Sequence, residues 1–293
     1  MKVKFQVWWT VWLWGMAWPL GAQVAYPQGA VEVPVYPISR PAFSLPESLH
    51  YAFSWNGLRA AEGEINVSLD PENRSQVHFS AQSQTVGLAR VLWKAQEGME
   101  TWSSRQTLKP ANALIHSREP TLQFDRKIVF DYKAGTMTSW KLGQEEPRQK
   151  VLEFRNAFDP LSLLFVLRSL EWQPGMERRF EVVDGENRYL LVLQALAEEP
   201  VKVAAGTYPA VKLSPTLIPL PRRLQGETPR WFERLRVREA QRPQMIKTLE
   251  FWISQDPPHP LLRVRSEAWI GHVDMELTSQ SEFSPGSGSP GEK

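Results

Sequence analysis

The feature that most constrains the fold is an alternation of apolar and polar residues that runs through most of the chain. This period of two is typical of half-buried antiparallel strands, in which successive side chains point to opposite faces of a sheet. Tyr51, Phe53 and Trp55 alternate before Asn56-Gly57, a dipeptide that strongly favours a two-residue hairpin. The pattern therefore predicts a mostly β fold.

Further strands follow at regular intervals, separated by turn residues. We expect more than ten strands in all. The clearest segments are 65–69, 77–81, 128–130, 137–140, 180–182, 189–193, 249–253, 262–268 and 273–277.

Two segments, 86–93 and 159–170, instead show helical spacing. In the second, Asp159 is placed as an N-cap acceptor and Pro160 as the first helical residue. An apolar stripe follows, which we interpret as core packing against a curved sheet. The stripe comprises Leu161, Leu164, Phe165 and either Val166 or Leu167.

The first 22 residues carry the pattern of a secretory signal peptide. Lys2 and Lys4 form a short positive region, residues 5–18 are largely apolar, and Pro19 ends any helix there. We expect cleavage after Ala22 and export to the periplasm of a bacterium. An uncleaved membrane anchor is the alternative, because the apolar stretch approaches the roughly 20 residues that span a bilayer.

Composition excludes several classes of protein. The chain has no cysteine, so we expect no lipid anchor at the cut, no disulfides and no thiolate chemistry. Its pI near 8.8 suggests a nucleic-acid or membrane-surface partner, but losing Lys2 and Lys4 lowers Lys plus Arg from 34 to 32, against 32 Asp plus Glu, which removes that argument from global charge. The mature net charge is then zero. We expect no nucleic-acid partner and no stable transmembrane segment after cleavage.

The mature chain divides by composition. We interpret 23–46 as a proline-rich extended arm or linker, 47–283 as a single β-rich domain, and 284–293 as a disordered Ser/Gly/Pro tail. Residues 219–242 are rich in arginine and proline.

Several short motifs occur in a distinctive order along the domain. They are Tyr51 to Trp55 with Asn56-Gly57, Gly63, Phe130-Asp131-Tyr132, Asp159-Pro160-Leu161-Ser162, Gly206-Thr207-Tyr208, Trp252-Ile253-Ser254, Pro260 and Gly271. This series resembles the domain-of-unknown-function family 3108 over about 49–278. The resemblance implies an exported envelope protein whose curved antiparallel sheet forms an open or spiral β-barrel, with one or two short helices packed against it. It implies no catalytic residue, and the stretch 219–242 is an insertion relative to its pattern.

No catalytic or metal-binding motif is evident. The histidines lack metal-ligand spacing, and the only string close to a nucleophile elbow lies in the tail, at 286–289. We expect no cofactor and no metal. Acids that could be paired for hydrolysis have the spacing of ordinary strand or loop charges. These pairs are Asp125 with Asp131, Glu97 with Glu100, and Asp256 with Asp274; the histidines are His50, His78, His116, His259 and His272.

Two groups of residues are binding candidates. Eight of the thirteen tryptophans lie beyond residue 22, and on alternating strands we expect them in the core. The arginine-rich stretch predicts a site for an anionic ligand or partner, because one guanidinium group can bind a carboxylate or a phosphate through two parallel hydrogen bonds. A solvated hairpin is the alternative. The site would comprise Arg230, Trp231, Arg234, Arg236 and Arg238.

The sequence favours a non-enzymatic envelope protein that binds a lipid, a glycan or a protein partner in the groove of its curved sheet. A hydrolase acting on envelope polysaccharide is the alternative. An outer-membrane barrel is disfavoured by the two helices, the proline-rich arm and the tail. The sequence does not indicate the oligomeric state.

Overall fold

The computed structural model describes residues 33–38, 41–143, 149–224, 246–268 and 271–281. They form one large sheet, as the alternation predicts, and two helices, as the helical spacing predicts. The strands are β1 (Glu47–Trp55), β2 (Leu58–Leu69), β3 (Gln76–Thr85), β4 (Gln96–Ser104), β5 (Pro110–Arg118), β6 (Gln123–Asp131), β7 (Thr136–Lys141), β8 (Gln149–Glu153), β9 (Ala157–Phe158), β10 (Glu177–Val183), β11 (Arg188–Val203), β12 (Gly206–Leu220), β13 (Ile246–Ser254), β14 (Leu261–Ala268) and β15 (Gly271–Ser281). The helices are α2 (Gly87–Leu92) and α3 (Pro160–Arg168).

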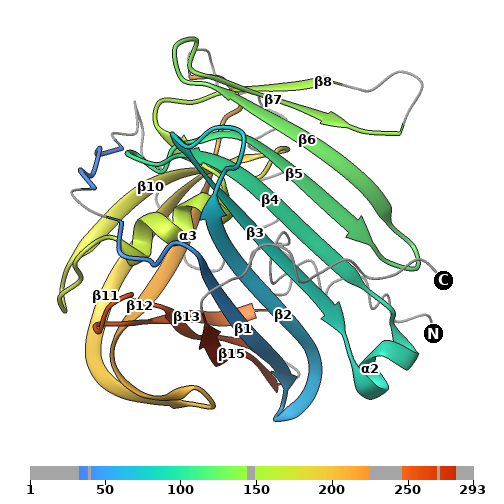
Figure 1. The fold of residues 1–293 in the computed structure, drawn as a ribbon, viewed down its shortest axis with the longest axis vertical. Helices are drawn as coiled ribbons and strands as arrows, with labels where there is room; N and C mark the ends of the chain where they lie inside the picture. The colour runs from blue at the N-terminus through green and yellow to red at the C-terminus, as the bar shows by residue number, and fades with distance from the viewer. Residues whose placement is uncertain (1–32, 39–40, 144–148, 225–245, 269–270, 282–293) are drawn as a thin grey trace.

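The sheet has an unusual order of strands. From one edge to the other it runs β8 to β1, then β15 to β9, so the two edge strands are neighbours in the chain. Only β9 and β10 pair in parallel among the described strands. Strand β1 pairs with β15 and brings the first and last strands of the domain together. Figure 1 shows the resulting curved wall, with α3 held against its inner face.

The turn between β1 and β2 has the conformation that its sequence predicts. Asn56 and Gly57 both have positive φ, at 48° and 81°, as a two-residue hairpin turn requires. The Asn56 side chain accepts a hydrogen bond from the backbone of His272 at 3.0 Å. A Cβ on Gly271 would lie 2.0 Å from the Asn56 Oδ1, so only glycine fits there. The turn between β1 and β2 is thereby held against the start of β15, although the two are far apart in the sequence.

Helix α3 is anchored at its N-terminus inside the curved sheet. The buried Asp159 carboxylate accepts hydrogen bonds from the backbone of Leu161 and Ser162 and from the Thr101 hydroxyl. Burial raises the pKa of this carboxyl. The helix packs on β3, β4 and β10, and the Phe165 ring stacks on Phe79 with 4.0 Å between centroids. The apolar stripe therefore faces the core, as the spacing predicts.

Strands β1 to β8 form one wing of the sheet and β9 to β15 form the other, and the two wings also contact each other away from the β1–β15 pair. The Ser139 hydroxyl on β7 donates to the Gly185 carbonyl in the turn between β10 and β11, and Arg126 on β6 forms an ion pair with Glu186. On edge strand β8, the Glu153 amide donates to the Arg222 carbonyl. These contacts curl the sheet into an open barrel. No helix in the described part of the chain is long and apolar enough to cross a bilayer.

Candidate functional site

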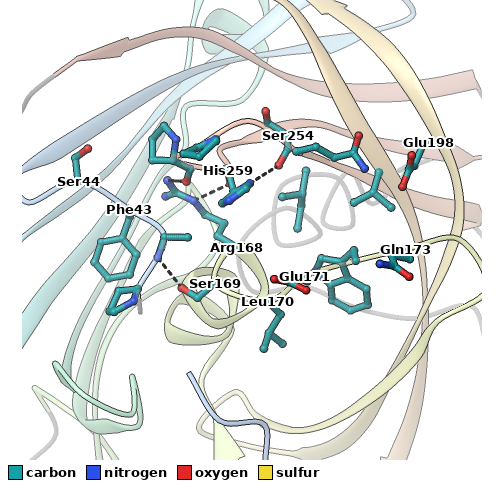
Figure 2. Close-up of a pocket in the computed structure, with 18 residues that line it drawn as sticks. Phe43, Ser44, Arg168, Ser169, Leu170, Glu171, Gln173, Glu198, Ser254 and His259 are labelled. Carbon is teal, nitrogen blue, oxygen red and sulfur yellow. Dashed lines mark hydrogen bonds between the residues drawn. The ribbon is translucent and has the colours of Figure 1, made fainter. Parts of the chain in front are cut away.

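A pocket of about 700 Å³ lies between the C-terminal end of α3 and the connection from β13 to β14. Figure 2 shows its walls, which come from segments that are distant in the sequence. They comprise residues 41–44, 168–173, 253–255 and 257–259, with Glu198 and Val211 from β11 and β12. This volume is typical of a small-molecule site.

Arg168, the last residue of α3, is completely buried and lies at the base of the pocket. Its guanidinium pairs with the buried Glu47 of β1: Nη2 donates to Oε1 at 2.9 Å, and Nη1 lies 2.8 Å from Oε2 without the alignment of a hydrogen bond. It also donates to the carbonyls of Pro258 and His259, each at 3.0 Å. The positive charge is thus neutralised inside the protein, so Arg168 positions the walls and is a poor anion receptor.

Two hydroxyl groups and the imidazole in the pocket wall, those of Ser169, Ser254 and His259, are engaged with the backbone. Ser169 donates to the Phe165 carbonyl and accepts from the Ala42 amide, and Ser254 donates to the Asp256 carbonyl. His259 Nδ1 lies 3.0 Å from the Ser254 carbonyl oxygen, away from the serine hydroxyl. These residues therefore form no serine–histidine pair of the kind that nucleophilic catalysis uses.

The remaining lining is mixed. Phe43, Trp172 and Ile253 are buried and supply apolar contact area. Glu171 and Glu198 are exposed at the pocket, and neither forms an ion pair with another described residue. This lining suits a ligand that combines hydroxyl groups with apolar faces, and it disfavours an anion, because two unpaired carboxylates repel one.

A second group of acids comprises Glu97, on the inner face of β4, and Glu119, which directly follows β5. Glu97 is buried, and its Oε1 accepts a hydrogen bond from the Ser117 hydroxyl at 2.8 Å. Burial raises the pKa of Glu97 to about 7, and the nearby Glu119 contributes to the increase. Burial also raises the pKa of Glu119. This pair is held without a buried cation, unlike Glu47.

Comparison with known proteins identifies the family. The chain matches the family described as Protein of unknown function (DUF3108) over residues 50–278. The chain belongs to this family. No curated protein matches it. The resemblance inferred from the motifs is therefore confirmed, over nearly the same residues.

Solved structures show a similar fold. A β-barrel-like protein of the domain of unknown function DUF1849 from Brucella abortus is 5% identical, with a TM-score of 0.51 over 83% of this chain and 100% of that chain. Two further structures are each 9% identical to this chain. One is a candidate exported protein with a YmcC-like fold from Bacteroides fragilis, and the other is a candidate lipoprotein from Parabacteroides distasonis. They cover 84% of this chain and 100% and 99% of theirs, with TM-scores of 0.33 and 0.32. The first confirms the curved, barrel-like architecture; the other two are too distant to bear on it.

The binding residues predicted from sequence, Arg230, Trp231, Arg234, Arg236 and Arg238, lie outside the described residues, so that site stays a prediction. The division into arm, domain, insertion and tail likewise stays a prediction.

The fold separates one of the acid pairs named from sequence, Glu97 and Glu100. Glu97 faces inward and is buried, whereas Glu100, three positions later on the same strand, faces outward and contacts His78 at 2.9 Å. Residues three apart on a strand lie on opposite faces, so these two carboxylates cannot act on one substrate.

Three of the other acids have local partners for their carboxyl groups, and the fourth, Asp256, contacts its neighbour through the backbone. Asp125 contacts His116 and Arg118, which lower its pKa, Asp131 caps the turn before β7, and Asp274 pairs with Arg265 on β14. Asp256 lies in the turn after β13, where its carbonyl accepts from Ser254. In the described parts of the chain, no three histidine or acidic side chains gather as they would around a metal ion.

Sequence reasoning did not identify the pocket residues. One signal was available, because Arg168 follows directly on the apolar stripe of α3, and a charge beside such a stripe requires a buried partner. Its partner Glu47 lies 121 positions away, and nothing local in the sequence indicates the pairing.

Proposed function

We propose that this chain is an exported, non-enzymatic envelope protein that binds a neutral, hydroxyl-rich ligand, such as a glycan fragment, in the pocket beside Arg168. The leader at residues 1–22 supports export to the periplasm and release from the membrane. The lining of the pocket supports the ligand class.

The observation that carries this proposal is the contrast between the base and the rim of the pocket. At the base, the Arg168 charge is neutralised by Glu47, so no free cation attracts an anion. At the rim, Glu171 and Glu198 offer carboxylate acceptors for hydroxyl groups, near the apolar surfaces of Phe43 and Trp172. Sugars present both hydroxyl donors and apolar ring faces, and such sites bind them by hydrogen bonds and stacking.

Ser169, Ser254 and His259 in the pocket are held by backbone groups, so they do not supply a serine nucleophile and its base for the hydrolase alternative.

The proposal is tested by native mass spectrometry of the exported chain with neutral oligosaccharides and soluble peptidoglycan fragments. We expect a complex that Gln173→Trp, on the exposed rim, weakens about tenfold or more by filling the entrance. Gln123→Trp, exposed on β6, is the matched control and should bind as the wild type does. No binding to any of these glycans, or equal binding by both variants, would exclude the pocket as the site.

The same spectra test the non-enzymatic assignment. Recovery of the glycans at unchanged mass supports a binder, and fragments that appear only with the protein would contradict it. N-terminal sequencing of the exported protein tests the leader, with Gln23 as the expected first residue.

A further inference from the structure

Helix α2 is unusual because it buries nothing. It has six residues, none of them buried, and Leu88, Val91 and Leu92 are 83%, 82% and 82% exposed. Short helices are marginal in water and usually gain their stability by packing an apolar face. This helix directs its apolar side chains outward instead.

A fourth apolar side chain lies on the strand that α2 contacts. Leu58, at the start of β2, is 72% exposed. The Val86 amide, directly before α2, donates to the carbonyl of Ala60 on β2 at 2.9 Å. The main packing partner of α2 is this same strand, β2. We call Leu58, Leu88, Val91 and Leu92 the apolar tip. In Figure 1, α2 lies at a corner of the sheet, beyond the end of β3.

The apolar tip differs from the other exposed apolar residues of the described chain. Val151 on β8 and Leu196 on β11, for example, are 52% and 44% exposed and occur singly on strands. Scattered residues of this kind are ordinary, whereas several large apolar side chains clustered in water mark an interaction surface.

The surroundings of the apolar tip are positively charged. Arg90 donates only to neutral acceptors, Gln84 Oε1 at 3.3 Å and the Thr85 carbonyl at 3.4 Å, and the exposed Lys94 has no acidic partner in the described structure. Arg59 is compensated by Glu62 at 3.2 Å. Two uncompensated cations therefore flank four exposed apolar side chains.

We propose that the apolar tip docks this protein on an anionic bilayer surface, with Leu58, Leu88, Val91 and Leu92 inserted at the boundary of head groups and acyl chains. Peripheral proteins bind membranes through this combination, in which apolar side chains enter the interface and cations meet anionic head groups. A protein partner would need a groove matched to side chains that project almost completely from the surface, whereas a fluid bilayer adapts to them. This inference does not depend on the ligand of the pocket.

The test is co-sedimentation of the full exported chain with vesicles of phosphatidylethanolamine and phosphatidylglycerol. We expect binding, and we expect Leu88→Ser with Leu92→Ser to weaken it at least about tenfold, because the apolar area that enters the bilayer is lost. Arg90→Gln with Lys94→Gln should weaken it about fivefold for each cation removed and reduce its sensitivity to salt.

Matched controls distinguish docking through the apolar tip from nonspecific adsorption to the vesicles. Val151→Ser with Leu196→Ser removes two exposed apolar side chains elsewhere, and Arg105→Gln with Lys133→Gln removes two exposed cations elsewhere. Both controls should bind vesicles as the wild type does. All variants share the same N-terminus, so any contribution of an uncleaved leader cancels. Thermal unfolding confirms that each is folded.

Several results would overturn the proposal. They are an absence of wild-type binding to these vesicles, equal binding by the apolar-tip variant and the wild type, and a loss as large in the controls. Self-association that the same two leucine substitutions abolish, without any vesicle binding, would instead assign the apolar tip to a protein interface.

Discussion

Two regions of the interior hold buried acids in opposite ways. At the base of the pocket, Glu47 is paired with Arg168, and the guanidinium binds two further carbonyls. On the inner face of β4, Glu97 lies near Glu119, which directly follows β5, and the hydrogen-bond partner of Glu97 is a serine hydroxyl. A paired buried charge fixes geometry at any pH at which both groups are ionised, whereas an unpaired acid makes folding depend on pH.

The comparison suggests that the two regions have different roles, one in the geometry of the pocket and the other in the pH dependence of stability. The Glu47–Arg168 pair joins β1, α3 and the turn before β14, so it sets the shape of the pocket. Burial raises the pKa of Glu97 to about 7, so its charge changes near neutral pH, and it forms no hydrogen bond or ion pair with Glu47 or Arg168 in the described structure.

The largest expected effect comes from breaking the buried pair. Arg168→Met leaves Glu47 buried without its cation, and we expect it to lower the free energy of unfolding by about 4 kcal/mol. Urea unfolding at pH 7 measures the loss. Glu47→Gln with Arg168→Met should recover much of it, because no charge is then stranded. A loss below about 1 kcal/mol in the single variant would show that the pair is unimportant.

A smaller effect of opposite sign is expected at Glu97. Its folded-state pKa of about 7 lies above the ordinary 4.5, so its contribution to stability is complete below about pH 4.5 and is lost as the pH rises through 7. Glu97→Gln removes this loss. At pH 8 the variant should be more stable than the wild type by about 2 kcal/mol, after allowance for solvent that reaches the carboxyl.

Urea unfolding of both proteins at several pH values between 4 and 8 measures this difference. It should vanish at about pH 4, where Glu97 is protonated in both states. A constant difference across the range would contradict the assignment.

The neighbouring acid allows a finer test. Glu119 raises the pKa of Glu97 by repulsion, so Glu119→Gln should lower that pKa, with a change in stability at pH 7 below about 1 kcal/mol. Carboxyl carbon NMR titration of Glu97 follows the change. An unchanged Glu97 titration would mean that burial alone sets its pKa.

The smallest effect is expected at a surface pair. The Arg59 and Glu62 side chains are 62% and 41% exposed, so solvent screens their attraction. Arg59→Gln should change the free energy of unfolding by less than about 0.5 kcal/mol. A loss comparable to that of Arg168→Met would show that pairing itself, rather than burial, decides the energetics.

Local patterns in the sequence predicted much of the fold. The alternation of Tyr51 and Phe53 indicated the inward face of β1, Asn56-Gly57 specified its turn, and Asp159-Pro160 located the start of α3. Each depends on residues within a few positions of one another, where steric and hydrogen-bonding preferences act directly. The expectation that strand tryptophans lie in the core is correct for Trp252 but wrong for Trp55, which is 39% exposed because β1 ends there.

The candidate site was not predictable in the same way. Its base depends on Glu47 meeting Arg168, and its walls combine segments around residues 43, 170 and 255. Such contacts follow from the strand order, which alternation does not reveal. The raised pKa of Glu97 likewise arises from burial at a position that sequence alone presents as an ordinary strand acid.

The junction of β1 with β15 has a consequence for how the molecule folds. Every other ladder among the described strands joins neighbours in sequence, antiparallel except for β9 with β10, so each wing of the sheet can grow from contacts between successive strands. The junction alone unites residues as distant as His50 and Thr278, 228 positions apart. Closing so long a loop is slow. The two wings can therefore form early and independently, and the pairing of the first and last strands then joins them into one sheet.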